Sequence, residues 1–480
     1  MKFQQHQREY RQALLSQQTR REALRKMGAG IGSIGLASML GTQNSAASIA
    51  AGPLAPKAPH FPARAKRVIQ LFMPGGPSQV DTFDYKPMLA KHAGERPDIV
   101  NRKSLRNTKM GLMPSPFEFK QYGQSGKWVS DIFPETAKCV DDICFVHSMY
   151  TDIPEHAGAI LMSNLGSLQP NRPSMGSWLL YGLGAETEDL PGFVAMSPVA
   201  QPRGKAANWG SSFLPGAYAG SYVNIQEMKP EAALRNLKNA SLPKAEQRKQ
   251  ADLLAKLNGI NLKKLEKDQQ LEAAIQSMEM AFRMQFSVPD VFDISKESKA
   301  TLDLYGESEF AKGCLVARRL IEEGVRVVQL SHSISGYDIA WDTGHNDIVG
   351  GHAALAKACD QGIAALLKDL KSRGLLEDTL VVWGGEFGRA PTSEGAKGRD
   401  HDHYGYTTWM AGGGVKPGFS YGATDEFGLS AVENRTHVHD FNATILHLMG
   451  LDHKELTYRY SGRDYRLTDV HGHVIHDIIS

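Results

Sequence analysis

The sequence predicts an α/β fold in which helices cover both faces of a mostly parallel sheet. Short apolar, β-branched runs alternate along the chain with longer segments of helical periodicity. The expected strands are residues 67–73, 142–148, 325–331, 379–383 and 406–411. The expected helices are residues 156–164, 174–181, 310–323, 352–373 and 440–450. Strands that alternate with helices form a three-layer sandwich around a parallel sheet.

The composition is that of an ordinary globular protein. The chain has 480 residues, of which 41% are hydrophobic, so there is ample material for a core. Its 54 basic and 52 acidic residues nearly balance, which argues against a nucleic-acid partner. Beyond the first 60 residues, no apolar run approaches the roughly 20 residues that span a bilayer, so no stable membrane span is expected.

Residues 1–60 are predicted to be a targeting segment and linker. A polar stretch with paired Arg20 and Arg21 is followed by a weakly apolar, Gly-rich run, 27–40, and by small residues at 46–51. That order is typical of an export signal, and the arginine pair is typical of the twin-arginine pathway. We therefore expect the twin-arginine translocase as a partner and a periplasmic or extracellular location. The alternative, an amphipathic helix, is disfavoured by the glycines.

Residues 61–480 are expected to form one domain with an insertion. Residues 229–285 are rich in Lys, Glu, Leu, Ala and Gln and show helical periodicity, with a break near Gly259. This segment is predicted to be an inserted helical hairpin. Its charges are interpreted as a solvated face and not as a binding surface.

The four cysteines show no CxxC pair and no zinc-finger spacing. Cys139 and Cys144 lie five residues apart, so a small disulfide loop is one interpretation in an oxidising compartment. Buried free thiols are the other.

Polar loops adjoin several of the predicted strands. In open α/β sheets the ligand binds beyond the carboxyl ends of the strands, so these loops carry the candidate site. They cover residues 75–84, 341–345, 385–389 and 399–403. Their carboxylates and imidazoles form one candidate ligand set for a divalent metal: Asp342, His345, Glu386, and His401 or His403. Such ligands suit zinc, manganese, calcium or magnesium.

Other polar residues are candidates for substrate binding and catalysis. Arg389 and Arg399 are predicted to clamp an anion through paired donors. His156 opens a predicted helix, whose N-terminus favours anions, so it is placed to attack or protonate an oxyanion. Each residue also has a structural interpretation. Glu386 and Arg389 can pair with each other, and Asp84 can stabilise its loop or cap a helix.

Several motifs in order carry a family resemblance. They are GGPSQVDTFD, WDTGH, EFGR followed by GRDHDH, AGGGVKPG, and the tail that begins HVHDFNATILHLMG. From about Arg67 to the end, the chain resembles the exported, sulfatase-like "domain of unknown function 1501" family. The resemblance implies the alkaline phosphatase and sulfatase fold, with a central, mostly parallel sheet between helical layers. It places His156 at the nucleophile position.

The chain departs from that superfamily at several positions. The superfamily has an Asp directly after the first strand, where this chain has Pro74-Gly75-Gly76, so Asp81 and Asp84 become candidate metal ligands. Glu386-Phe387 replaces an Asp-His pair. No Cys or Ser precedes a Pro-x-Arg at the nucleophile position, which excludes formylglycine chemistry there. Ser78 is an alternative nucleophile.

These features lead to a first functional hypothesis, an exported metal-dependent hydrolase of sulfate or phosphate esters. Its substrate would be an anionic small molecule or a sulfated or phosphorylated glycan, a class that follows from the resemblance alone. The alternative is a non-catalytic binding or structural protein that keeps the sulfatase-like fold. A third hypothesis is hydrolysis or isomerisation without a covalent step, with His156 as acid or base.

Overall fold

The computed structural model describes residues 53–101, 110–198, 201–225, 246, 290–334 and 338–480. The predicted targeting segment lies outside these ranges except for residues 53–60, and the predicted hairpin 229–285 lies outside them except for residue 246. Within the described ranges, no helix has the length and apolar character that crossing a membrane requires.

A nine-stranded sheet forms the centre of the domain. Its order is β12 (Ser420–Tyr421), β4 (Ile143–Tyr150), β11 (Tyr406–Ala411), β8 (Thr379–Gly384), β1 (Arg67–Phe72), β7 (Val327–Ser331), β5 (Phe193–Ser197) and β6 (Ser221–Asn224), and β15 (Thr436–His437) also pairs with β4. Strand β11 is antiparallel to both of its neighbours. The other pairings are parallel, which confirms the predicted mostly parallel sheet.

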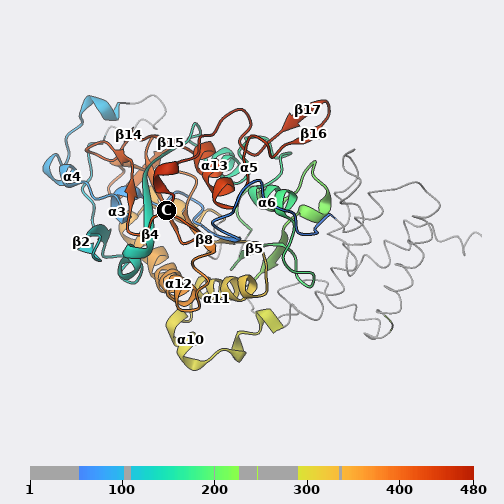
Figure 1. Ribbon diagram of the computed structural model, residues 1–480. Helices are drawn as coiled ribbons and strands as arrows, with labels where there is room; N and C mark the ends of the chain where they lie inside the picture. Colours follow the sequence, from blue (N-terminus) through green and yellow to red (C-terminus); the bar gives the residue numbers. More distant parts are fainter. Residues whose placement is uncertain (1–52, 102–109, 199–200, 226–245, 247–289, 335–337) are drawn as a thin grey trace, which may run out of the picture.

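Helices cover both faces of this sheet (Figure 1). One face packs against α10 (Lys299–Tyr305), α11 (Glu309–Glu322) and α12 (Ala353–Ser372), and the other against α5 (His156–Leu165), α6 (Met175–Leu183) and α13 (Val438–Leu448). Strand side chains alternate between the two cores: Val381 and Trp383 enter the first, whereas Leu380 and Val382 enter the second. This is the three-layer sandwich that the sequence predicts.

Smaller elements surround the sandwich. Four antiparallel pairs are β2 (Phe119–Tyr122) with β3 (Lys127–Ser130), β9 (Gly388–Glu394) with β10 (Gly398–Asp402), β13 (Ala423–Thr424) with β14 (Ala431–Glu433), and β16 (Tyr458–Tyr460) with β17 (Arg463–Tyr465). Two short helices, α3 (Gln79–Thr82) and α4 (Pro87–Lys91), follow β1. A 3-10 turn, η6 (Ala340–His345), and a π-helical turn, η7 (Ile348–His352), precede α12.

The β9–β10 hairpin differs from the sequence-based expectation of two polar loops. Arg389 of β9 lies opposite His401 of β10, with an irregularity in the register beside it. Apart from Ala390 and Pro391, both strands consist of Gly, polar and charged residues and yet are largely buried, so they lack the apolar alternation that indicates a strand. The hairpin fixes the spacing of the two segments that were expected to be loops.

The carboxyl ends of three central strands meet at one edge of the sheet. Phe72, the last residue of β1, pairs with Ser331 of β7 and with Gly384 of β8. The loop after β1 packs against the segment after β7, because the Trp341 amide donates to the Pro74 carbonyl at 2.9 Å. A Cβ atom on Gly75, whose φ is 112°, would lie 2.7 Å from the Trp341 nitrogen. This close approach explains the glycine at that position.

All four cysteines, each within the described part of the chain, are buried free thiols. The disulfide interpretation of Cys139 and Cys144 is therefore wrong, and the buried-thiol interpretation is confirmed. Burial raises the pKa of Cys139 to about 11 and that of Cys144 to about 12. Both side chains act as small apolar groups of the core.

Candidate metal centre

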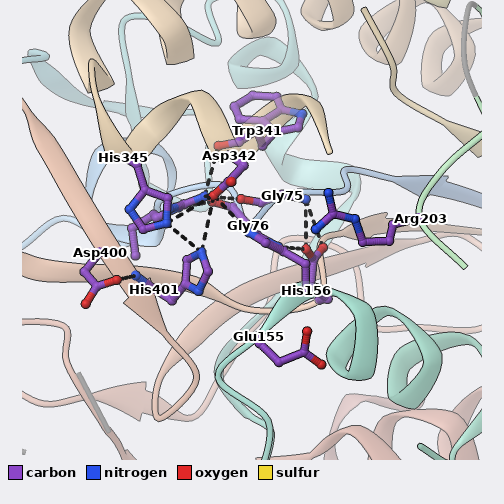
Figure 2. A network of polar contacts seen from close by, with 12 residues as sticks. Gly75, Gly76, Glu155, His156, Arg203, Trp341, Asp342, His345, Asp400 and His401 are labelled. Carbon is purple, nitrogen blue, oxygen red and sulfur yellow. Dashed lines mark hydrogen bonds and ion pairs between the residues drawn. The ribbon is translucent and has the colours of Figure 1, made fainter. Parts of the chain in front are cut away.

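Four side chains converge beyond the carboxyl edge of the sheet (Figure 2). His156 is the first residue of α5, Asp342 and His345 belong to the turn η6, and His401 lies in β10. One ligand-type atom of each residue lies within 4.8 Å of the others. We refer to His156, Asp342, His345 and His401 as the His/Asp cluster.

The spacing within the His/Asp cluster fits a small cation. Asp342 Oδ1 lies 2.9 Å from His156 Nε2 and 3.3 Å from the Nε2 atoms of His345 and His401. Those last two nitrogens are 2.8 Å apart. Four ligands in a tetrahedron with bonds of about 2.0–2.1 Å would stand about 3.3 Å from one another. The atoms are therefore close to the positions that such a metal needs.

Each imidazole of the cluster is held by its other nitrogen. His156 Nδ1 lies 2.6 Å from Glu386 Oε1, His401 Nδ1 lies 2.8 Å from the Pro154 carbonyl oxygen, and His345 Nδ1 contacts Glu394 Oε2. These acceptors favour a proton on Nδ1 and leave the Nε2 lone pair facing the cluster. This is the arrangement that orients metal-binding histidines in proteins.

His156 Nε2 gives an independent test of the fit. The atom is buried and has no hydrogen-bond partner among the described residues, although it forms an ion pair with Asp342. A buried nitrogen without a hydrogen bond is costly, and a bound cation would satisfy it. Together, the donor atoms of the His/Asp cluster fit a divalent metal.

The N-terminus of α5 already has an anion, because Glu155 caps the helix. Its carboxylate accepts hydrogen bonds from the backbone N–H groups of Ala157 and Gly158 at 2.9 and 2.5 Å. The anion that was expected to bind at this helix end is thus supplied by the chain itself. The cap also sets the start of the helix and so holds His156 at its first position.

The electrostatics of the cluster favour a charged carboxylate. Burial lowers the pKa of His345 to about 3, with nearby Arg389 adding to the effect, and burial also lowers the pKa of His401. For His156, burial lowers the pKa, but contacts with Asp342 and Glu386 outweigh it and raise the pKa. Burial alone would raise the pKa of Asp342, but His156, His401 and Arg389 together hold it far below its usual range. A bound cation would displace the proton of His156.

Glu386 lies behind His156 and not in the cluster itself. It is fully buried, and besides His156 it accepts a hydrogen bond from the Gly75 amide, at 2.9 Å on Oε1 and 3.1 Å on Oε2. Its carboxylate therefore links the loop after β1 to the start of α5.

Arg389 of β9 is fully buried and joins this strand to the loop after β1 and to the turn η6. Its Nε donates to the Gly76 carbonyl at 3.0 Å, and its Nη2 lies 2.8 Å from Asp342 Oδ1. Nη2 also contacts the carbonyl oxygens of Gly75 and Trp341. Arg389 thus helps to position Asp342 in the cluster.

The remaining predicted site residues lie outside the cluster. Asp81 forms a buried ion pair with Arg399, with oxygen–nitrogen distances of 2.6 and 3.1 Å, and also accepts from the Ser78 hydroxyl at 2.5 Å. Asp84 pairs with Lys86 Nζ at 3.0 Å and accepts from the Thr424 hydroxyl. The His403 ring packs against that of Tyr404, with centroids 4.0 Å apart. Each of these residues has a structural role elsewhere.

Sequence reasoning missed Glu394 and the Pro154 carbonyl, which hold His345 and His401. Glu394 is the last residue of β9, 49 residues from His345. Its role depends on the hairpin, which the sequence did not indicate. A carbonyl oxygen has no sequence signal, because every residue has one.

Comparisons with known proteins agree with the family resemblance. A family model described as "Protein of unknown function (DUF1501)" matches residues 65–479. A comparison with curated proteins found no match.

The chain is also similar to a number of solved structures, of which we give three. The lipoteichoic acid synthase LtaP from Listeria monocytogenes is 9% identical, with 85% of this chain and 76% of that chain covered and a TM-score of 0.36. The PsFucS1 sulfatase from Pseudoalteromonas sp. is 12% identical, with 81% of this chain and 68% of that chain covered and a TM-score of 0.35. A protein in the alkaline phosphatase superfamily from Vibrio parahaemolyticus is 10% identical, with 89% of this chain and 75% of that chain covered and a TM-score of 0.34. At TM-scores below 0.5, these likenesses say nothing about activity.

Proposed function

The chain belongs to the DUF1501 family of proteins of unknown function, and we propose that it is a metal-dependent hydrolase of sulfate or phosphate esters. One observation carries the proposal. Three imidazoles turn their Nε2 atoms toward one carboxylate oxygen, while their Nδ1 atoms are held from outside. Structural histidines have no need of such convergence, whereas a metal site depends on it.

His156, Asp342, His345 and His401 would hold the cation. Three imidazoles and one carboxylate suit zinc or manganese better than calcium or magnesium, which prefer oxygen ligands. A divalent metal at this place would supply Lewis-acid chemistry and hydroxide near neutral pH. The Asp342 side chain is 26% exposed, against 6% for His156, so substrate would approach from the side of Asp342.

The residues have roles in this proposal that differ from the sequence-based assignment. His156 Nδ1 is held by Glu386 and Nε2 faces Asp342 within the cluster, so His156 would serve as a ligand and not as a nucleophile. Ser78 is fully buried and donates to Asp81, which supports hydrolysis without a covalent step through that hydroxyl. Water would attack the ester directly.

Export by the twin-arginine translocase remains part of the proposal. That pathway carries folded proteins, so the domain would take up its metal before crossing the membrane. An anionic small molecule or glycan outside the cytoplasm would be the substrate.

A non-catalytic binding protein is the second candidate. It is favoured by the two predicted anion clamps, Arg389 and Arg399, which are both fully buried and bonded to the protein. In that case metal would bind, but no ester would be cleaved.

The test is metal content measured by mass spectrometry on protein purified without chelators, with ester hydrolysis assayed in parallel. His401→Gln should lose the metal and at least 100-fold of the activity on nitrophenyl sulfate or phosphate. His403→Gln is a matched control, since His403 is similarly buried two residues away, and it should keep both. A parent protein without metal would end the hydrolase proposal, and a metal-loaded parent inert toward esters would favour the binding protein.

A further inference from the structure

The two buried arginines near the cluster are bonded to the protein through every nitrogen of their guanidinium groups. Arg389 donates to carbonyl oxygens and to Asp342 through its Nε and both terminal nitrogens. Arg399 is bound in the same way by Asp81 and by the carbonyls of Ala390, Pro391, Met113 and Pro114. A substrate oxyanion at the cluster needs another cationic partner.

Arg203, in contrast to Arg389 and Arg399, is exposed to solvent. It follows β5 at the carboxyl edge of the sheet, and its side chain is 43% exposed. Its guanidinium pairs with Asp338, itself 42% exposed, with nitrogen–oxygen distances of 3.2 and 3.4 Å. Exposed pairs of this length contribute little to stability, so the pair can open readily.

The backbone of Arg203 is fixed to the helix that carries His156. Asn208 Nδ2 donates to the Arg203 carbonyl at 2.8 Å, and Asn208 Oδ1 accepts from Asn164 of α5 at 3.1 Å. Asn164 is buried and also accepts from Gln329 of β7 at 3.0 Å. Arg203 therefore has an exposed side chain on a fixed backbone.

The partner of Arg203 belongs to the loop that provides a cluster ligand. Asp338 lies four residues before Asp342, just ahead of η6. Figure 2 shows the Arg203 guanidinium directed toward the cluster, on the side of Gly75 and His156. Through Asp338, the charge of Arg203 is thus tied to the segment that leads into Asp342.

We infer that Arg203 binds the tetrahedral oxyanion of the substrate, exchanging the Asp338 carboxylate for two oxygens of a sulfate or phosphate ester. The planar guanidinium fork matches both groups. This inference rests on the proposed function, because it assigns the substrate contact of the same centre. In the absence of an anionic substrate, the Asp338 carboxylate pairs with the Arg203 guanidinium.

Two variants with opposite expected effects test the inference. Binding of inorganic sulfate and, separately, inorganic phosphate to the metal-loaded protein is measured by calorimetry, together with KM for the matching nitrophenyl ester. Arg203→Gln should weaken binding and raise KM by about 10- to 100-fold, because a charge-assisted contact is lost. Asp338→Asn should tighten anion binding several-fold, because the competing carboxylate is removed. Metal content should be unchanged in both.

The outcomes separate this inference from the proposed function. If the pair were only structural, both variants would change binding in the same direction, which would overturn the role of Arg203. Unchanged anion binding in Arg203→Gln, with an active parent, would do the same and leave the hydrolase proposal intact. A metal-loaded parent that neither binds these anions nor cleaves their esters would overturn both. Binding of one anion but not the other identifies the ester class.

Discussion

Replacing Glu386 by Gln should weaken metal binding by about 10- to 100-fold while the protein stays folded. Glu386 Oε1 lies 2.6 Å from His156 Nδ1 and 2.9 Å from the Gly75 nitrogen. A glutamine keeps the shape and one oxygen that can accept from both donors, but it lacks the charge that makes His156 a strong ligand. The expected loss corresponds to about 1.4–2.7 kcal/mol of binding free energy.

The assay is a titration of metal-free protein with zinc and with manganese, in competition with a chelating dye at constant pH. Thermal unfolding of the metal-free form reports on folding. Glu386→Ala should bind metal more weakly than Glu386→Gln and should unfold at a lower temperature. It also leaves the buried Gly75 N–H without an acceptor, at a cost of about 1–3 kcal/mol.

A matched control separates orientation of His156 from general stability. Asp360 is another buried carboxylate, and it accepts backbone N–H bonds from Glu135 and Thr136 at 2.7 Å, away from the cluster. Asp360→Asn should lower the unfolding temperature without changing the metal dissociation constant. Equal dissociation constants for Glu386→Gln and the parent would refute the reasoning.

Three other predictions concern the loop after β1, the response to acid, and the metal. Gly75→Ala should lower the free energy of unfolding by at least about 2 kcal/mol and reduce metal content, since its Cβ would collide with the backbone nitrogen of Asp342. The control is Gly374→Ala, at a position that also has positive φ but open space around it, and it should lower the free energy of unfolding by only about 1 kcal/mol. Burial, with the charge of Arg389, lowers the pKa of His352 to about 3. The unfolded chain binds that proton near pH 6.5, so stability should be full above that pH and fall toward pH 3, less steeply in His352→Gln by thermal unfolding. Removing metal with a chelator should lower the unfolding temperature. The free energy of unfolding should fall by up to about 4 kcal/mol when the free metal concentration had been 1,000 times its dissociation constant. An unfolding temperature insensitive to the chelator would contradict a bound metal.

The three-layer sandwich was predictable from short sequence patterns, because apolar runs indicate which segments are buried. The run TLVVW became β8 and RVIQLF became β1, both inside the sheet, since apolar β-branched residues pack well there. The start of α5 at His156 was also predictable from local features. Strands β9 and β10 were not, because their buried faces carry Gly, Arg, Asp and His in place of apolar residues.

Part of the candidate site was predictable and part was not. Asp342, His345 and His401 were predicted as ligands, and the structure brings them together with His156, which had been assigned to catalysis. Asp81 was also a predicted ligand, but it is bound to Arg399, 318 residues away in the chain.

The sequence by itself therefore determined the layers, the family, and the edge of the sheet where chemistry is expected, because these follow from periodicity and from motifs a few residues long. Only the tertiary structure decided which polar side chains meet. Each of Glu386, Asp81 and Arg389 has the chemistry to bind a metal or an anion, or to pair within the protein. The register of β1, β7 and β8 and the β9–β10 hairpin determine which partner lies within about 3 Å of each side chain. At that distance a buried charged group pairs with the nearest group of opposite charge.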